Sequence, residues 1–310
     1  MKKAILIILI LLTACQYFPS QKKLPQAPII FIGTQAIEIG WTQGTTTSTF
    51  VKQQAFFVVE LKNKGAYDVK NGRYSFIYQD QYIEPVQGIQ DAGLFSLNGK
   101  SQYNPQGDST RITFRAVAKE LPPQTETYQT PIIFQACYPY KTFTSAPICI
   151  DPDLANTNPR KVCKPAQAAL GGGQGAPVTV TRIVPIMVPE SPPGMEEVQA
   201  VRPAFEIYLK NAGTGYVINK DDIAAACGGQ AGTFAQKGFN RATITAVLQE
   251  TPLDCPKEVV LEPGQETMIL CDSKKTFDMT TGTFTTLLSV NIEYGYMKTI
   301  SMPLTITRRR

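Results

Sequence analysis

The chain has 310 residues, of which 43% are hydrophobic, and 30 Lys and Arg against 25 Asp and Glu give a formal net charge of +5 at pH 7. This hydrophobic content is typical of a globular protein, and the length favours two domains. The only dense basic run, 308–310, is too small for a nucleic-acid-binding face. The chain has no histidine, which excludes Ser-His-Asp and Cys-His catalysis and every His-containing metal site.

The N-terminus reads MKKAILIILILLTAC. The apolar run 4–12 is too short for a membrane-spanning helix, which needs ~20 residues, but it suits the hydrophobic region of a secretory signal. The sequence Leu12-Thr13-Ala14-Cys15 resembles a bacterial lipobox. The resemblance implies a signal peptide over 1–14, a lipid on Cys15 and a tether over 15–27, whose residues 16–27 reach at most ~40 Å. An ordinary signal peptide with a chance cysteine is the alternative.

Gln16 follows this cysteine. In Gram-negative lipoproteins a residue other than Asp there implies transfer to the outer membrane. We therefore expect an extracytoplasmic protein that is lipid-anchored to a bacterial outer membrane or to an archaeal or bacterial cell surface.

One phrase occurs twice in the chain. FFVVELKNKGAYDV at 56–69 returns as AFEIYLKNAGTGYV at 204–217, so that Leu61 matches Leu209 and Gly65 matches Gly213 at one offset, 209 − 61 = 148. Three further anchors recur in the same order: APIIFI (27–32) with APVTVT (176–181), LPPQTET (121–127) with LEPGQET (261–267), and YPY (138–140) with YGY (294–296). We therefore predict two copies of one domain, at 28–165 and 177–310, joined by a Gly-rich linker at 166–176.

Alternating apolar residues in both copies of the phrase predict strands with one buried face, as in antiparallel sheets. The Asn-x-Gly that follows ends the strand and begins a turn. IIFQACYPY and SAPICI predict a closing hairpin with its turn near Lys141–Thr144. No long helical pattern is present. Many short strands at turn spacing predict an all-β fold of two tandem immunoglobulin-like β-sandwiches.

The order of alternating strand, L-K-N-x-G, strand and L-x-P-G resembles the CARDB-like and related immunoglobulin-like modules of bacterial and archaeal surface proteins. In the first copy Pro-Gln stands where the second has Gly264-Gln265. The resemblance implies adhesion, spacing or ligand display, and it supplies no catalytic residues.

Six cysteines follow Cys15, and an even number in an exported chain predicts three disulfides. Cys137 and Cys149 flank the predicted hairpin turn symmetrically, and their counterparts in the second copy, Glu293 and Thr305, are not cysteines. These two cysteines are therefore expected to form a cross-strand bond. Cys255 and Cys271 flank the turn at 262–265 and form the second predicted bond. Elimination leaves Cys163 with Cys227. No CxxC knuckle indicates a zinc site.

Two further features suggest ligands. Tyr138, Tyr140, Tyr294 and Tyr296 lie two apart in each copy, so each pair shares a strand face and offers a stacking platform for a sugar, with core packing as the alternative. Asp151, Asp153, Asn156 and Asn158 have the alternating spacing of calcium ligands, but the run lacks the turn glycine and the closing glutamate. We expect no metal and no cofactor.

Three functions compete. The first is a non-enzymatic surface lipoprotein, a structural or adhesive component of the envelope that binds a protein partner there or in a surface filament. The second is a carbohydrate-binding module of a surface polysaccharide system that uses the paired tyrosines. The third is a hydrolase that acts through carboxylates. Exposure of the tyrosines in a row would favour the second over the first.

Overall fold

The computed structural model describes residues 30–191, 198–227 and 238–309. The fold is all-β, as predicted. The first half of the chain forms β1 (Ile37–Trp41), β2 (Ser48–Phe50), β3 (Gln54–Asn63), β4 (Val69–Ile77), β5 (Ile83–Pro85), β6 (Ala92–Leu97), β7 (Ser109–Ala118) and β8 (Thr127–Ile150).

The second half contains a short 3₁₀ turn, η2 (Lys220–Asp222), and one helical turn, α2 (Ile223–Ala226). The other elements are β9 (Ala168–Ala169), β10 (Val178–Glu190), β11 (Ala200–Asn211), β12 (Tyr216–Ile218), β13 (Arg241–Leu248), β14 (Thr251–Pro252), β15 (Glu258–Val260), β16 (Glu266–Asp272), β17 (Phe277–Asp278) and β18 (Phe284–Thr307).

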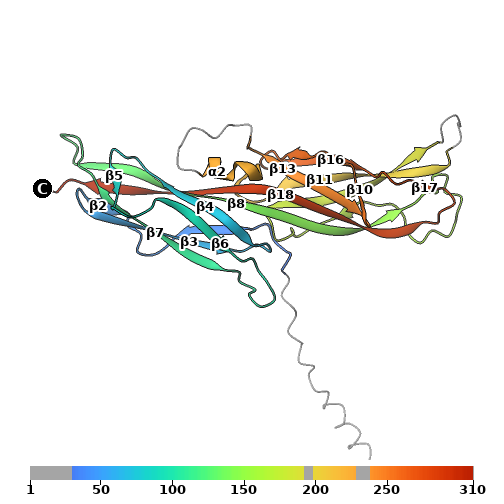
Figure 1. The fold of residues 1–310 in the computed structure, drawn as a ribbon, viewed down its shortest axis with the longest axis horizontal. Coiled ribbons are helices and arrows are strands. Elements are labelled where there is room, and N and C mark those ends of the chain that lie inside the picture. Colours follow the sequence, from blue (N-terminus) through green and yellow to red (C-terminus); the bar gives the residue numbers. More distant parts are fainter. Residues whose placement is uncertain (1–29, 192–197, 228–237, 310) are drawn as a thin grey trace, which may run out of the picture.

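A central sheet in the order β14-β13-β18-β8-β4-β6 runs the length of the molecule, with β12 and β2 paired to β18 and β15 to β13. Two smaller sheets cover its two ends and give an elongated, two-lobed body (Figure 1). The sheet β1-β3-β7-β5 packs on one end, where Phe76 of β4 stacks on Phe114 of β7 at 4.9 Å. The sheet β16-β11-β10-β9 belongs to the other end. Apolar residues between the layers form the core.

The two strands β8 and β18 have 24 residues each and pair antiparallel along their whole length, from Thr127 opposite Thr307 to Ile150 opposite Phe284. At ~3.4 Å per residue each spans ~80 Å. The predicted hairpin turn at 141–144 is therefore wrong. Lys141-Thr142-Phe143-Thr144 contains no turn residue, and its β-branched and aromatic side chains continue the inward–outward alternation of a strand.

These strands interleave the two halves. The first part of β8 pairs with β4 of its own half, whereas its last residues pair with the start of β18, which also pairs with β13. The end of β18 returns to the first lobe and lies parallel to β2, with Thr305 opposite Ser48. The last strand of each predicted domain, 28–165 and 177–310, thus extends into the lobe formed mainly by the other half of the chain.

The central anchor of the repeat is confirmed. Leu61 lies in β3 between Ile39 of β1 and Thr110 of β7. Leu209 lies in β11 between Val180 of β10 and Thr267 of β16. The two leucines therefore occupy equivalent positions in equivalent three-strand arrangements.

Two of the other anchors differ from prediction. Val178 is matched in the pairing by Ile37, which lies opposite Asn63 as Val178 lies opposite Asn211. The IIFI run is therefore not its counterpart, and residues 27–29 of that anchor lie outside the described residues. Thr127 begins β8 whereas Thr267 lies in β16, so the LPPQTET match is also wrong. Similar turns precede these strands, and the local resemblance carries no information on which strand follows.

Candidate functional site

The four tyrosines lie at the centre of the molecule and are buried, each at most 5% exposed. Tyr138 lies opposite Tyr296 and Tyr140 opposite Tyr294 across the β8–β18 ladder. The facing rings are 5.9 and 6.3 Å apart between centroids. The predicted stacking platform for a sugar is therefore wrong, because no ligand reaches these ring faces, and the alternative of core packing is correct.

The tyrosine hydroxyl groups accept hydrogen bonds from backbone N–H groups, and the two repeats share the same pattern of bonds. The hydroxyl of Tyr138 accepts a hydrogen bond from the backbone N–H of Ile37 at 3.2 Å. In the second copy, Tyr294 accepts from Val178 at 3.3 Å. Because Ile37 and Val178 begin equivalent strands, the first tyrosine of each pair fixes where the first strand of its repeat starts.

The second tyrosine of each pair holds the LKNxG turn. The hydroxyl of Tyr140 accepts from the N–H of Tyr67 at 3.3 Å, and that of Tyr296 accepts from Gly215 at 2.7 Å. Within each turn the asparagine side chain bridges the backbone, since Asn63 accepts from Gly65 at 3.1 Å and donates to Tyr67 O at 2.8 Å. Asn211 makes the same two bonds to Gly213 and Gly215.

This turn requires glycine because the tyrosine hydroxyl leaves no room for a Cβ atom. A Cβ at Gly65 would collide with the hydroxyl of Tyr140, and one at Gly213 would collide with that of Tyr296. Burial raises the pKa of Tyr138 and Tyr294 well above the ordinary value, raises that of Tyr140, and raises that of Tyr296 to about 12. The repeated phrase is therefore a structural device, as predicted.

The disulfides partly differ from prediction. Cys255–Cys271 forms as expected, across 16 residues. The predicted Cys137–Cys149 and Cys163–Cys227 bonds are wrong: the pairs are Cys137–Cys227, with Cα atoms 5.9 Å apart, and Cys149–Cys163, also at 5.9 Å. Cys137 and Cys149 lie 12 positions apart in one extended strand, about 40 Å, so they cannot meet. Cys15 lies outside the described residues.

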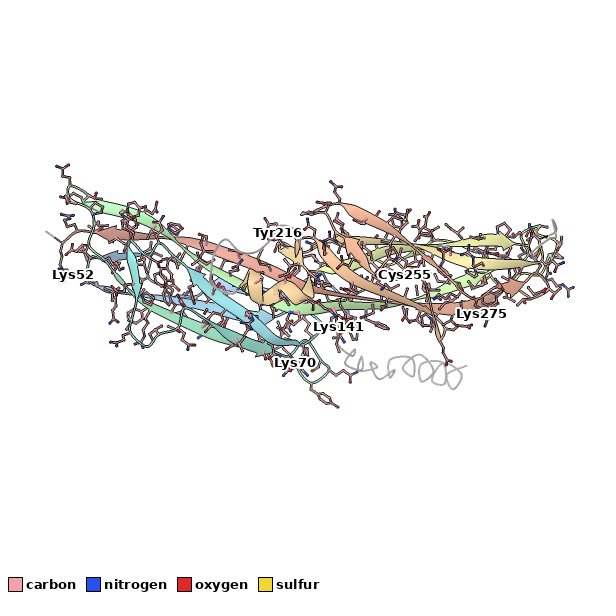
Figure 2. All side chains as sticks on the ribbon, turned by 45° about the horizontal axis from the view of Figure 1, so that its top comes forward. Lys52, Lys70, Lys141, Tyr216, Cys255 and Lys275 are labelled. Atoms are coloured by element: carbon pink, nitrogen blue, oxygen red, sulfur yellow. A yellow bond between two sulfur atoms is a disulfide. The ribbon has the colours of Figure 1, made fainter. Side chains whose placement is uncertain are left out.

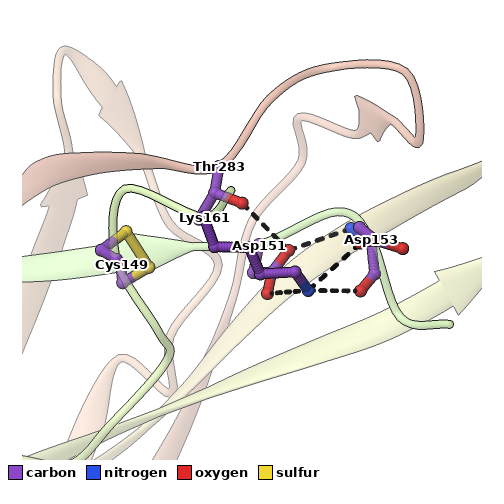
Figure 3. Close-up of a disulfide and its surroundings, with 6 residues drawn as sticks. Cys149, Asp151, Asp153, Lys161 and Thr283 are labelled. Carbon is purple, nitrogen blue, oxygen red and sulfur yellow. Dashed lines mark hydrogen bonds and ion pairs between the residues drawn. A yellow bond between two sulfur atoms is a disulfide. The ribbon is translucent and has the colours of Figure 1, made fainter. Parts of the chain in front are cut away.

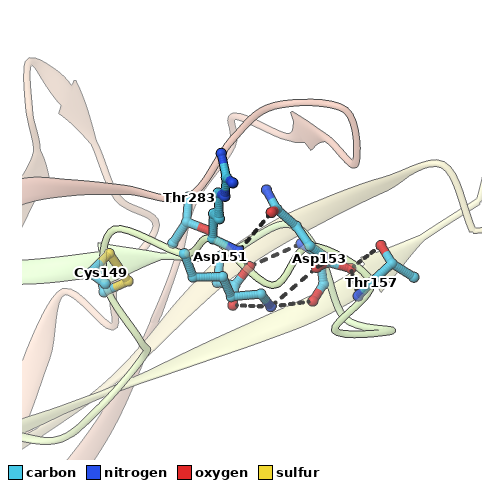
Figure 4. Close-up of polar contacts among 9 residues, drawn as sticks. Cys149, Asp151, Asp153, Thr157 and Thr283 are labelled. Carbon is cyan, nitrogen blue, oxygen red and sulfur yellow. Dashed lines mark hydrogen bonds and ion pairs between the residues drawn. A yellow bond between two sulfur atoms is a disulfide. The ribbon is translucent and has the colours of Figure 1, made fainter.

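The Asp151 loop follows β8 and is closed by the Cys149–Cys163 disulfide (Figure 3). The ammonium group of Lys161 lies 2.7 Å from Asp151 Oδ2 and 3.3 Å from Asp153 Oδ2, and its side chain is only 8% exposed. Asp153 also accepts from the backbone N–H groups of Thr157 at 3.0 Å and Asn158 at 2.8 Å (Figure 4).

These contacts show what the Asp/Asn spacing does. Hydrogen bonds from Asn158 and Thr157 hold the pKa of the Asp153 carboxyl well below its ordinary value, and the bond to Asp151 raises the pKa of Lys161. The Lys161 ammonium thus lies between the two carboxylates that a calcium ion would need and offsets one of their two negative charges. In the described part of the chain, no group of three His, Cys, Asp or Glu side chains could hold a metal ion. The disulfide, the ion pairs and the hydrogen bonds therefore fix the conformation of this loop at the end of β8.

A second, exposed site lies on the outer face of the central sheet, near mid-length. Lys141 and Phe143 alternate outward on β8, and the Tyr67 side chain lies beside them: its ring is 5.5 Å from Lys141 Nζ, and its hydroxyl accepts from the N–H of Phe143 at 3.0 Å. Phe31 packs against Tyr67 at 5.9 Å. With exposed Lys70, these residues make up what we call the junction face; Figure 2 shows Lys70 and Lys141 near mid-length.

Two hollows adjoin the junction face. One, of about 450 Å³, is lined by Lys70, Lys141 and Lys220 together with Asp68 and Glu293, so its lining carries one net positive charge. Lys220 is paired with Glu293 at 2.9 Å. The other, of about 360 Å³, lies between Phe31, Phe143 and Leu170. Phe31 is 56% exposed and Phe143 47% exposed, so aromatic rings and lysines share one exposed surface.

The corresponding place in the other repeat is covered. The tyrosine repeat has the offset 294 − 138 = 156, so Lys141 corresponds to Met297 (297 − 156 = 141). Met297 is buried with Ile218, Ile223 and the Cys137–Cys227 disulfide beneath α2. That cover is formed by residues 219–227, which follow β12, together with Phe239. In the first repeat β4 continues instead through a bulge at Asn71, with φ 57°, and leaves the junction face open.

The sequence analysis did not predict the junction face. Its signal in the sequence is the outward alternation of Lys141 and Phe143, which the predicted hairpin turn concealed.

None of the described helices is long and apolar enough to cross a membrane. No known family model matches the chain, and no curated protein matches it.

Proposed function

We propose that this chain is a non-enzymatic lipoprotein of the cell envelope, held to a membrane through Cys15, whose rigid body serves as a structural or adhesive component. The observation that carries the proposal is the conjunction of the Leu12–Cys15 lipobox with a disulfide-bonded all-β body. Three disulfides indicate an extracytoplasmic location, since such bonds persist in oxidising compartments.

The shape of the body supports a role in spacing and display. Two continuous ~80 Å strands form one ladder without a hinge between the lobes, so the body resists bending. The four tyrosines at its centre are buried and bond backbone, and the carboxylates of Asp151 and Asp153 are paired with Lys161. The tyrosines and the Asp151 loop therefore stabilise the fold. This favours a protein that acts by binding a partner in the envelope or in a surface filament. The buried tyrosines offer no surface for a sugar.

The test replaces Cys15 with Ser in the full chain and follows the protein in its native membrane by fractionation. The matched control is Gln16→Ser, which keeps the cysteine and changes its neighbour. We expect Cys15→Ser to move into the soluble fraction while Gln16→Ser stays with the membrane. Retention of Cys15→Ser on the membrane would overturn the anchor.

A further inference from the structure

The described chain begins at the middle of the long axis of the body, not at an end (Figure 1). Its first residues are fastened there, because Gly33 donates to Gly172 O at 2.6 Å and accepts from Gly175 at 2.9 Å. Phe31 lies two residues earlier, in contact with Tyr67. Any attachment that precedes residue 30 therefore leaves the body beside the junction face.

The length of chain between the anchor and this point is short. Residues 16–29 number 14, and a chain of that length reaches at most ~50 Å when fully extended. A lipid on Cys15 would hold the junction face within that distance of the bilayer. Even a weak affinity of the junction face for lipid would then suffice for binding, because the lipid anchor keeps the face at a high effective concentration beside the bilayer.

The chemistry of the face suits the headgroup region. Exposed apolar side chains, Phe among them, bury at the boundary between headgroups and acyl chains, and lysines beside them attract anionic lipid. Phe31 and Phe143 supply the rings, and Lys70 and Lys141 the charge. Tyr103, which is 99% exposed, lies on the β6–β7 loop, which Lys100 fastens to the turn before Tyr67 by a 2.8 Å bond to Gly65 O.

We propose that the junction face rests on an anionic bilayer, so that the body lies with its long axis along the membrane and presents both lobes sideways. This inference depends on the proposed lipid anchor. It also accounts for the asymmetry of the repeats: the face above Met297 is covered by α2, whereas the equivalent face at Lys141 is left for the membrane.

The test measures how fast single lysines react with a water-soluble acetylating reagent. The lipidated full chain is placed in vesicles of equal parts phosphatidylglycerol and phosphatidylcholine and compared with full-length Cys15→Ser in solution. Lys70 and Lys141 report on the face, and Lys52 and Lys275, toward the two ends, are the internal controls (Figure 2). We expect Lys70 and Lys141 to react roughly fivefold more slowly on the vesicles, with less than about a twofold change at the ends.

A variant separates the face from the anchor. Lys141→Glu combined with Phe143→Ser should stay lipidated and membrane-bound but lose the protection of Lys70, whereas Lys275→Glu should keep it. If a lipidated protein shows the same change in rate on vesicles at Lys70 and Lys141 as at Lys52 and Lys275, this inference alone is overturned. Protection in native membranes but not on vesicles would assign the face to a protein and also overturn it. An unlipidated Cys15 would overturn both this inference and the proposed function.

Discussion

Pro139 of β8 lies directly opposite Gly295 of β18, and the two residues mark the point about which the repeat is symmetric. On either side of them, each tyrosine of one repeat faces the non-equivalent tyrosine of the other. The contact between the repeats therefore includes a continuous ladder of backbone hydrogen bonds, four packed rings and the Cys137–Cys227 disulfide, and is not that of two finished domains that touch. Neither lobe has its full sheet without a strand from the other half.

This arrangement predicts one cooperative unfolding transition for the whole body. Calorimetry of the full chain should give a calorimetric enthalpy equal to the van't Hoff enthalpy. The fragment 28–165 should fail to fold, because it lacks 296–307, the residues that pair with the first half of β8. Two separate transitions, or a folded fragment, would show that the lobes are independent.

The turn glycines give a prediction with a matched control. Gly65→Ala and Gly213→Ala should each destabilise the protein by about 1–3 kcal/mol, because the new methyl group meets a tyrosine hydroxyl and backbone oxygen or side-chain carbon. Gly40→Ala on β1 has open space around its Cβ and should change stability by less than about 0.5 kcal/mol. The measurement is urea unfolding.

A double variant checks the cause. Tyr296→Phe removes the hydroxyl that Gly213→Ala encounters, so the two changes together should cost less than their sum. Strict additivity would mean that the hydroxyl is not what excludes a side chain from this turn.

The buried tyrosines predict a loss of stability in alkali. Their folded-state pKa values are raised above the unfolded value of about 10. Their contribution is full below pH ~10, and it falls as the pH rises toward the folded pKa, because only the unfolded chain then releases these protons. Each tyrosine should add roughly 1.4 kcal/mol per pH unit to the slope.

Melting temperatures of wild type and Tyr296→Phe between pH 9 and pH 12 test this, since the folded pKa of Tyr296 is about 12. The variant should show a smaller slope, whereas Tyr103→Phe, at a 99% exposed position, should keep the full slope. Equal slopes in all three proteins would contradict the burial of the Tyr296 hydroxyl.

The disulfides should contribute unequally. In the chain-entropy model, removing Cys137–Cys227, whose separation is 90 residues, should cost about 4–5 kcal/mol. Removing Cys149–Cys163, at a separation of 14, should cost about 3 kcal/mol. Paired Cys→Ser variants in denaturant unfolding measure both. Peptide mapping without reductant that links Cys137 to Cys149 would contradict the extended β8.

Part of this fold is readable from the sequence. The outward–inward alternation around Leu61 and Leu209 and the Asn-x-Gly that follows are local signals, and local signals identify strands and turns. The Cys255–Cys271 pair flanks one turn and is equally local. The buried tyrosine cluster was visible only as a spacing of two, which says that two rings share a face but not which face is covered.

The rest depends on distant parts of the chain. The predicted turn at 141–144 ended the strand too early, because the partner strand β18 lies far along the chain: Pro139, for example, lies opposite Gly295, 156 positions away (295 − 139 = 156). The Cys137–Cys227 bond depends on the folding of the segment after β12 back over β8. The junction face likewise depends on where Phe31 packs. No local pattern contains these relationships.

The most direct test of the proposed function is mass spectrometry of the N-terminal peptide from protein purified from its native membrane. We predict a mature chain that begins at Cys15 and carries a lipid on that residue. An unmodified Cys15, or a chain that still begins at Met1, would contradict the account.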